Sequence, residues 1–159
     1  MEMRQTLIDI SNDARGWLKA WTDGFTEEHA SDSGGTKTNP IAWQLGHLAC
    51  VEDDVFRLFT GEQGIVPDEV RAVCASGCPT PTAATRYPAL KELWSLLDRT
   101  HTRLTELIQD TDDLDREPLE ENRFFHSLGQ AAYEAALHEN YHVGEIATLR
   151  KAIGLRPIG

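Results

Sequence analysis

Apolar residues recur every three or four positions over four long stretches of this chain, and no stretch of comparable strength alternates apolar and polar residues. This spacing is typical of amphipathic helices, because strands repeat with a period of two. The first stretch shows it most clearly, with Leu7, Ile10, Ala14, Trp17, Leu18, Trp21 and Phe25 at helical spacing. The sequence therefore predicts an all-α protein.

The ends of the expected helices are marked by residues that commonly start or stop a helix. Asn39-Pro40 is a typical start and Ser127 is a good amino-terminal cap, while Gly61 and Gly154 are typical stops. On these signals we expect helices over residues 3–28, 40–60, 88–109 and 127–153.

A long connection joins the second and third expected helices. Residues 61–87 contain three prolines among small residues, and within them Asp68 to Ala75 could form a short helix. The connection is long enough to run from one end of a bundle to the other. We expect a single domain over residues 1–159, folded as a four-helix bundle with a crossover between its second and third helices.

The composition argues against several classes of protein. A net charge of −11 disfavours nucleic acid as a partner, because phosphate backbones are bound by clustered Lys and Arg. The chain has neither a signal-peptide pattern nor an apolar run of about 20 residues, so we expect a cytoplasmic protein with no membrane partner. The cysteines, Cys50, Cys74 and Cys78, match no zinc or redox spacing, and we interpret them as reduced thiols.

Two histidines, His138 and His142, lie four residues apart in the last expected helix. Side chains at this spacing are neighbours on one helix face, so one divalent ion can bind both imidazoles. With Glu139 they also spell the H-E-x-x-H motif of zinc proteases. The protease interpretation is disfavoured, because no further histidine follows His142 and Glu139 points about 100° around the helix from His138.

A third histidine, His47, lies on the expected inner face of the second helix, within the run NPIAWQLGHLA over residues 39–49. This run, followed about ninety residues later by HENYHVGEIATLRKAIG, resembles the DinB/YfiT-like family of metal-dependent enzymes. The resemblance extends over nearly the whole chain. It implies that His47, His138 and His142 bind a metal ion.

Three protein ligands leave coordination positions open for water or substrate, as in catalytic zinc sites. Imidazole ligands suit zinc or nickel, and the sequence does not choose between them. We predict Glu145 and Tyr141 as catalytic residues. Glu145 stands where the family often has glutamine. It could accept a hydrogen bond from a metal-binding residue, or it could act as a general base. The alternatives are an ion pair of Glu145 with Arg150 or Lys151, and simple packing of Tyr141.

Three more residues fall on the inner faces of the expected helices. Asp54 could reach a ligand on the metal, although an ordinary solvated acid is the simpler interpretation. His101 interrupts an apolar stripe and is more often a core residue than a ligand at such a position. Trp43, four residues before His47, is expected to pack in the core and to screen the pocket.

The resemblance implies two routes of catalysis on a small-molecule substrate. Activation of water gives a hydrolase, and activation of a low-molecular-weight thiol, such as bacillithiol, mycothiol or glutathione, gives an S-transferase. The thiol route needs cationic groups at the mouth, for which Arg57, Arg123 and Arg150 are candidates. The alternative is a noncatalytic, stress-linked metal-binding module. If the pocket around His47 is open to a ligand, the enzyme interpretation is favoured. If Trp43, Phe56 and Phe125 close that pocket, the enzyme interpretation is weakened. The family also suggests a homodimer.

Overall fold

The computed structural model describes residues 3–158 of the chain, and within them all regular structure is helical. The prediction of an all-α protein is therefore confirmed. No described helix has the length and apolar character needed to cross a lipid bilayer. The helices are α1 (Met3–Thr22), the 3₁₀ turn η1 (Glu27–His29), α2 (Ile41–Thr60), α3 (Asp68–Cys74), α4 (Leu90–Asp110) and α5 (Leu128–Ala152).

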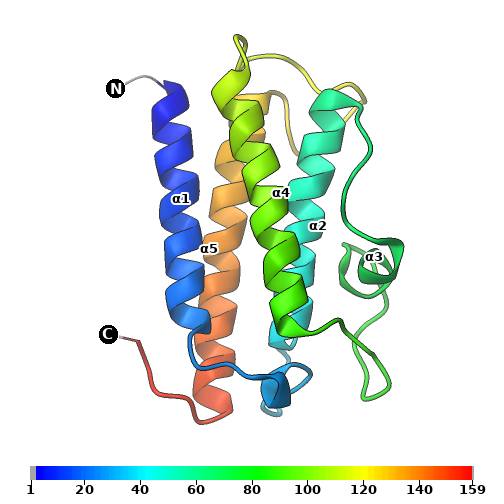
Figure 1. Cartoon of the computed structure of the whole chain (residues 1–159), viewed down its shortest axis with the longest axis vertical. Helices are drawn as coiled ribbons and strands as arrows, with labels where there is room; N and C mark the ends of the chain where they lie inside the picture. Colours follow the sequence, from blue (N-terminus) through cyan, green and yellow to red (C-terminus); the bar gives the residue numbers. More distant parts are fainter. Residues whose placement is uncertain (1–2, 159) are drawn as a thin grey trace.

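The four long helices lie side by side with their axes roughly aligned (Figure 1). In this view α1 and α5 run downwards, while α2 and α4 run upwards. Residues 61–89, which contain α3, return from the upper end of α2 to the lower end of α4, so these two helices run in the same direction. α1 packs against α5, and α2 packs against α4 and α3.

Most predicted helix ends lie within two residues of the observed ones. Gly61 ends α2 with a left-handed φ of 72°, and the Ser127 hydroxyl accepts a hydrogen bond from the Gln130 amide at the start of α5. The start of α2 differs in detail: Pro40 is itself the cap residue, and no side chain caps this end.

The first helix was predicted too long, because α1 ends at Thr22 rather than near residue 28. Gly24 has a φ of 84°, a left-handed conformation that glycine adopts without strain and that a continuing α-helix excludes. The apolar pattern continues past this break through Phe25, which packs on the core from a loop. Trp17 also departs from the expected core pattern, since it is 58% exposed.

The core consists of two apolar clusters with polar side chains between them along the helices. The first includes Leu18, Leu48 and Leu97, and the second includes Leu7, Val55 and Leu104. The buried polar side chains that fall between the two clusters in sequence include Arg15 of α1, Glu52 of α2, Thr100 and His101 of α4 and Glu139 of α5. Because buried charges require partners, this layer constrains how the long helices align.

Candidate metal centre

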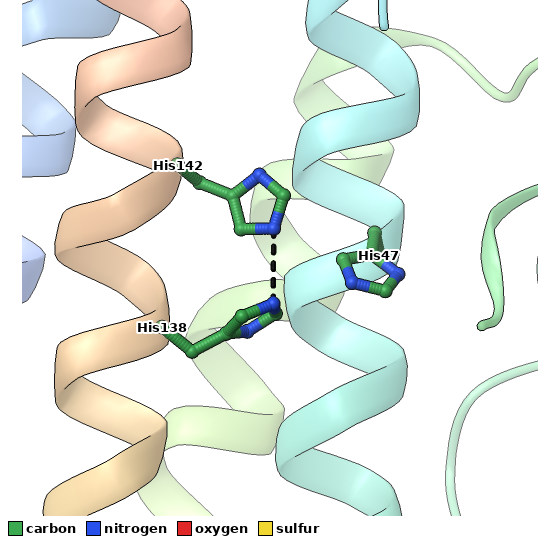
Figure 2. Close-up of side chains that lie close together, drawn as sticks. All are labelled: His47, His138 and His142. Atoms are coloured by element: carbon green, nitrogen blue, oxygen red, sulfur yellow. Dashed lines mark hydrogen bonds between the residues drawn. The ribbon is translucent and has the colours of Figure 1, made fainter.

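Three imidazoles converge where α2 faces α5 (Figure 2). His47 comes from α2, and His138 and His142 come from successive turns of α5. The ring centroids of His47 lie 5.1 Å from those of both other histidines, and His138 and His142 are 4.5 Å apart. One nitrogen from each ring lies within 4.8 Å of the other two, so the three residues could hold one metal ion.

The spacing of the α5 pair fits a shared ion. Nε2 of His138 lies 3.1 Å from Nε2 of His142. Two nitrogens that are each about 2.1 Å from one ion, with an angle of about 90–109° between the bonds, are about 3.0–3.4 Å apart. The two rings therefore already have the separation that a common ion requires.

His47 is held from behind by two contacts. Its Nδ1 lies 2.9 Å from the carbonyl oxygen of Cys74, the last residue of α3. Because a carbonyl oxygen only accepts, Nδ1 carries the proton and Nε2, on the side of the α5 histidines, keeps its lone pair (Figure 2). Trp43 stacks on the imidazole at 4.4 Å between centroids and 12° between planes. Trp43 was expected in the core, but it is half-buried, belongs to neither apolar cluster and does not line the pocket beside His138.

His142 has the same arrangement with different partners. Its Nδ1 donates to Oε1 of Gln44, and it also lies 3.1 Å from Oε2 of Glu145. The amide of Gln44 is itself oriented, since its Nε2 donates to the carbonyl oxygen of Asn39 at 3.1 Å. Gln44 is completely buried, so this amide is a fixed acceptor. Nε2 of His142 is thereby left free for a ligand bond.

All three imidazoles are neutral near pH 7. Burial, followed by the neighbouring histidines, lowers the pKa of His138 to about 4 and that of His142 to about 3. Burial also lowers the pKa of His47. Neutral imidazole is the form that binds metal, so no proton has to leave before an ion enters. Among the described residues, His138 Nδ1 is buried without a hydrogen-bond partner, so this ring is held less firmly than the other two.

Glu139 faces away from the three histidines and lies in the buried polar layer. Its carboxylate contacts Arg15, which also contacts Glu52 with Nη2 2.9 Å from Oε1. His101 joins this layer through Nδ1, 3.1 Å from the same Oε1, and so lies outside the histidine site. Glu52, His101 and Glu139 are close enough to hold a cation, but the Arg15 guanidinium already occupies the space between the two carboxylates. This layer is therefore an ion-pair network.

A pocket of about 690 Å³ borders the histidine site at His138. It lies between α2, α5 and the loop before α5, and His138 forms part of its wall. Val51, Val55, Leu58 and Phe125 supply apolar surface, and its charged side chains are Asp54, Arg123 and Glu134. An open pocket therefore borders the site on the side of His138; Phe125 lines this pocket, whereas Trp43 and Phe56 do not. Phe56 instead lies under Arg103, 3.8 Å from ring centroid to guanidinium carbon.

The two predicted catalytic residues lie beside His142 but do not line this pocket. Glu145 contacts Nδ1 of His142, on the side of the ring away from His138, and the Tyr141 hydroxyl donates to Glu145 Oε1 at 3.3 Å. Tyr141 is 62% exposed. The alternative for Glu145, an ion pair with Arg150 or Lys151, is not formed in the described structure, since Arg150 donates to backbone carbonyls of residues 21, 23 and 156.

Comparison with models of protein families adds evidence independent of this geometry. The model described as the DinB superfamily matches residues 11–146, a range that includes all three histidines. The chain belongs to the DinB superfamily. The predicted family resemblance is thus confirmed. A search of curated proteins found no match.

Three parts of this DinB site were not identified from the sequence: the Gln44 amide, the Cys74 carbonyl and the Glu134 carboxylate. For Gln44 and Glu134 a signal was present. Gln44 precedes His47 by three residues, and Glu134 precedes His138 by four, so each shares a helix face with a histidine. The carbonyl of Cys74 gives no sequence signal, because any residue supplies one.

Proposed function

We propose that this DinB superfamily protein binds one divalent metal ion through His47, His138 and His142 and uses it in enzymatic catalysis on a small molecule. The observation that supports this most directly is that Nδ1 of two of the three rings, those of His47 and His142, is hydrogen-bonded to a fixed acceptor. Because Cys74 and Gln44 accept hydrogen bonds from Nδ1 of His47 and His142, Nε2 of each ring is left free as a donor atom, and one nitrogen from each of the three rings lies within 4.8 Å of the other two.

The donor set fits a late transition metal. Three neutral imidazoles suit zinc or nickel and leave coordination positions open. When bound, such an ion acts as a Lewis acid that lowers the pKa of a water or thiol. The chain's own contribution is to hold the three rings, to exclude bulk water with the stacked Trp43, and to admit the substrate along the wall that contains His138.

The pocket supports an enzyme over a noncatalytic metal-binding module. A purely structural metal site is usually closed by a fourth protein ligand, whereas here the wall beside His138 opens into a pocket with apolar and charged sides. Two reactions remain in the proposal: hydrolysis with activated water, and S-transfer with a low-molecular-weight thiol. Of the arginines predicted for the thiol route, Arg123 lines the pocket, while Arg57 pairs with Asp54 at 3.5 Å.

We further propose that the four long helices form a four-helix bundle with residues 61–89 as its crossover, and that two chains form a homodimer. The exposed apolar side chains on α5 support the dimer: Tyr133, Leu137 and Tyr141 follow one another at intervals of four residues and are 43–62% exposed. Light scattering on the purified protein distinguishes a dimer from a monomer.

The proposed metal site is tested by elemental analysis of protein purified without a histidine tag. We expect about one zinc or nickel ion per wild-type chain and much lower content in the His47→Ala, His138→Ala and His142→Ala variants. His126→Ala is the matched control, because His126 is an exposed loop histidine outside the site. Full metal content in His142→Ala, or no metal in the wild type after reconstitution, would reject the ligand assignment.

A further inference from the structure

The pocket beside His138 contains a carboxylate to which no role has been given, that of Glu134. It lies one helical turn before His138 on α5, and both side chains line the pocket. Residues four apart on a helix have neighbouring side chains, so Glu134, His138 and His142 follow one another along one face of α5. A molecule bound against His138 therefore lies within reach of the Glu134 carboxylate.

Glu134 is also available for chemistry. It is half-buried, and within residues 3–158 it forms neither an ion pair nor a hydrogen bond. The other charged groups that face it around the pocket are Asp54 from α2 and Arg123 from the loop before α5. The Arg123 guanidinium stacks over the ring of Phe124, 4.7 Å from its centroid, and pairs with no carboxylate in the described part of the chain.

The other acids near the site are occupied by other contacts. Asp54 lines the same pocket, but its Oδ1 lies 2.6 Å from Nη1 of Arg71 and also contacts Arg57. These two arginine contacts leave the Asp54 carboxylate less free than that of Glu134 to contact a molecule bound in the pocket. Glu145 contacts Nδ1 of His142, on the far side of the ring from the pocket. Glu134 is thus the carboxylate that combines access to the pocket with freedom from partners.

We propose that Glu134 is the general base of this pocket. In the step assigned to it, the O–H or S–H bond of a bound water or thiol breaks. The proton passes to a Glu134 carboxylate oxygen, and the electron pair stays on the oxygen or sulfur atom that faces His138. No electron is gained or lost by the protein, and Glu134 later returns the proton to product or solvent. This inference rests on the proposed metal site and adds the residue that handles the proton.

The test follows the binding of 2-mercaptoethanol to cobalt-loaded protein by stopped-flow absorption. This thiol is a suitable probe because its S–H proton must leave before sulfur binds a metal ion. The variants are Glu134→Gln, which keeps the shape of the side chain, and Glu106→Gln, which removes the same charge from an exposed position on α4. Cobalt content and the thermal unfolding midpoint are measured for each protein first.

We expect Glu134→Gln to keep its cobalt and its fold and to bind the thiol at least about tenfold more slowly near neutral pH, consistent with the usual contribution of a general base. The affinity should change much less than the rate, because a base accelerates binding and release together. The deficit should shrink as the pH approaches the pKa of the free thiol, since solvent then supplies thiolate. Glu106→Gln should match the wild type.

Several results would overturn the inference. These are an unchanged rate in Glu134→Gln, an equal loss of rate and affinity, loss of cobalt from this variant, or failure of the cobalt-loaded wild type to bind the thiol. Equal losses would show that Glu134 only shapes the pocket, and loss of cobalt would make it a ligand. Failure of the wild type to take up any metal would instead reject the metal site itself, which separates the two hypotheses.

Discussion

The guanidinium of Arg15 and the carboxylate of Glu139 form a buried ion pair, with Nε of Arg15 2.7 Å from Oε1 of Glu139. The pair links α1 to α5 one residue after His138. It also directs the glutamate of the H-E-x-x-H motif into the core, where an arginine pairs with it, and this argues against a protease role. Because Arg15 also contacts Glu52 of α2, it joins the two helices that supply the three histidines.

Arg15→Met should destabilise the protein strongly. Removing the guanidinium leaves the carboxylates of Glu52 and Glu139 buried without their cation, and breaking a buried pair in this way typically costs about 3–5 kcal/mol. The free energy of unfolding from urea titration measures this loss. Lys19→Met is the control, because Lys19 lies on α1 like Arg15 but pairs at the surface with Asp98 of α4, and its loss should change stability by less than about 1 kcal/mol. Similar losses in both variants would contradict the importance of the buried network.

Gln44→Leu should weaken metal binding without removing any proposed ligand. The leucine offers no acceptor to Nδ1 of His142, so the ring loses its main orienting contact, and such changes typically cost about 10- to 100-fold in metal affinity. Competition with a zinc chelator measures the affinity. Gln44→Glu retains an oxygen at the same place and should lose less. Equal affinity in Gln44→Leu and the wild type would show that Glu145 alone orients His142.

The metal-free protein should lose stability as the pH falls below about 6.5. The folded state holds the pKa of His138 at about 4 and that of His142 at about 3, whereas in the unfolded chain both lie near 6.5. Between these values the unfolded chain binds more protons, so the free energy of unfolding decreases as the pH drops through this window. Above it, both states are neutral and this contribution is fully present.

Thermal unfolding of chelator-treated protein at neutral pH and at about pH 5 measures this effect. The carboxylates of the chain also titrate towards the acidic end of this range, so a His138→Gln/His142→Gln double variant is needed as the reference. We expect its midpoint to fall less on acidification than that of the wild type. Parallel decreases in the two proteins would show that the buried imidazoles are not the cause.

Gly46→Ala should disturb the support of His47. A Cβ at this position would overlap Sγ of Cys74 and lie only 2.9 Å from its Cβ, so α3 would have to move and carry the Cys74 carbonyl away from Nδ1 of His47. We expect a loss of about 1–3 kcal/mol in stability, together with weaker metal binding. Urea titration and chelator competition measure the two effects.

Gly144→Ala is the matched substitution for this prediction. It lies within α5, where an added Cβ meets no atom within 4 Å. Because alanine is favoured over glycine inside helices, this variant should gain about 0.5–1 kcal/mol and keep its metal affinity. A loss in Gly144→Ala equal to that in Gly46→Ala would show that the contact with Cys74 is not the cause of the effect at Gly46.

Features that depend on neighbouring residues could be predicted from the sequence. Apolar periodicity located the long helices, and Ser127 and Gly61 located helix ends, because caps and left-handed glycines act over a few residues. The pairing of His138 with His142 belongs to the same class, since spacing of four in a helix brings two side chains together wherever that helix packs. The motif around His47 indicated the DinB superfamily, which the family match over residues 11–146 confirms.

The partners of those residues depend on how distant segments pack, and they could not be predicted. The approach of His47 to the α5 pair, the Cys74 carbonyl behind it and the pairing of Arg15 with Glu139 all join segments far apart in the chain. Helical periodicity fixes the direction of a side chain around its own axis but not which helix lies opposite. Glu139 could therefore be excluded from the metal face by its angle, while its partner Arg15, 124 residues away, emerged only from packing.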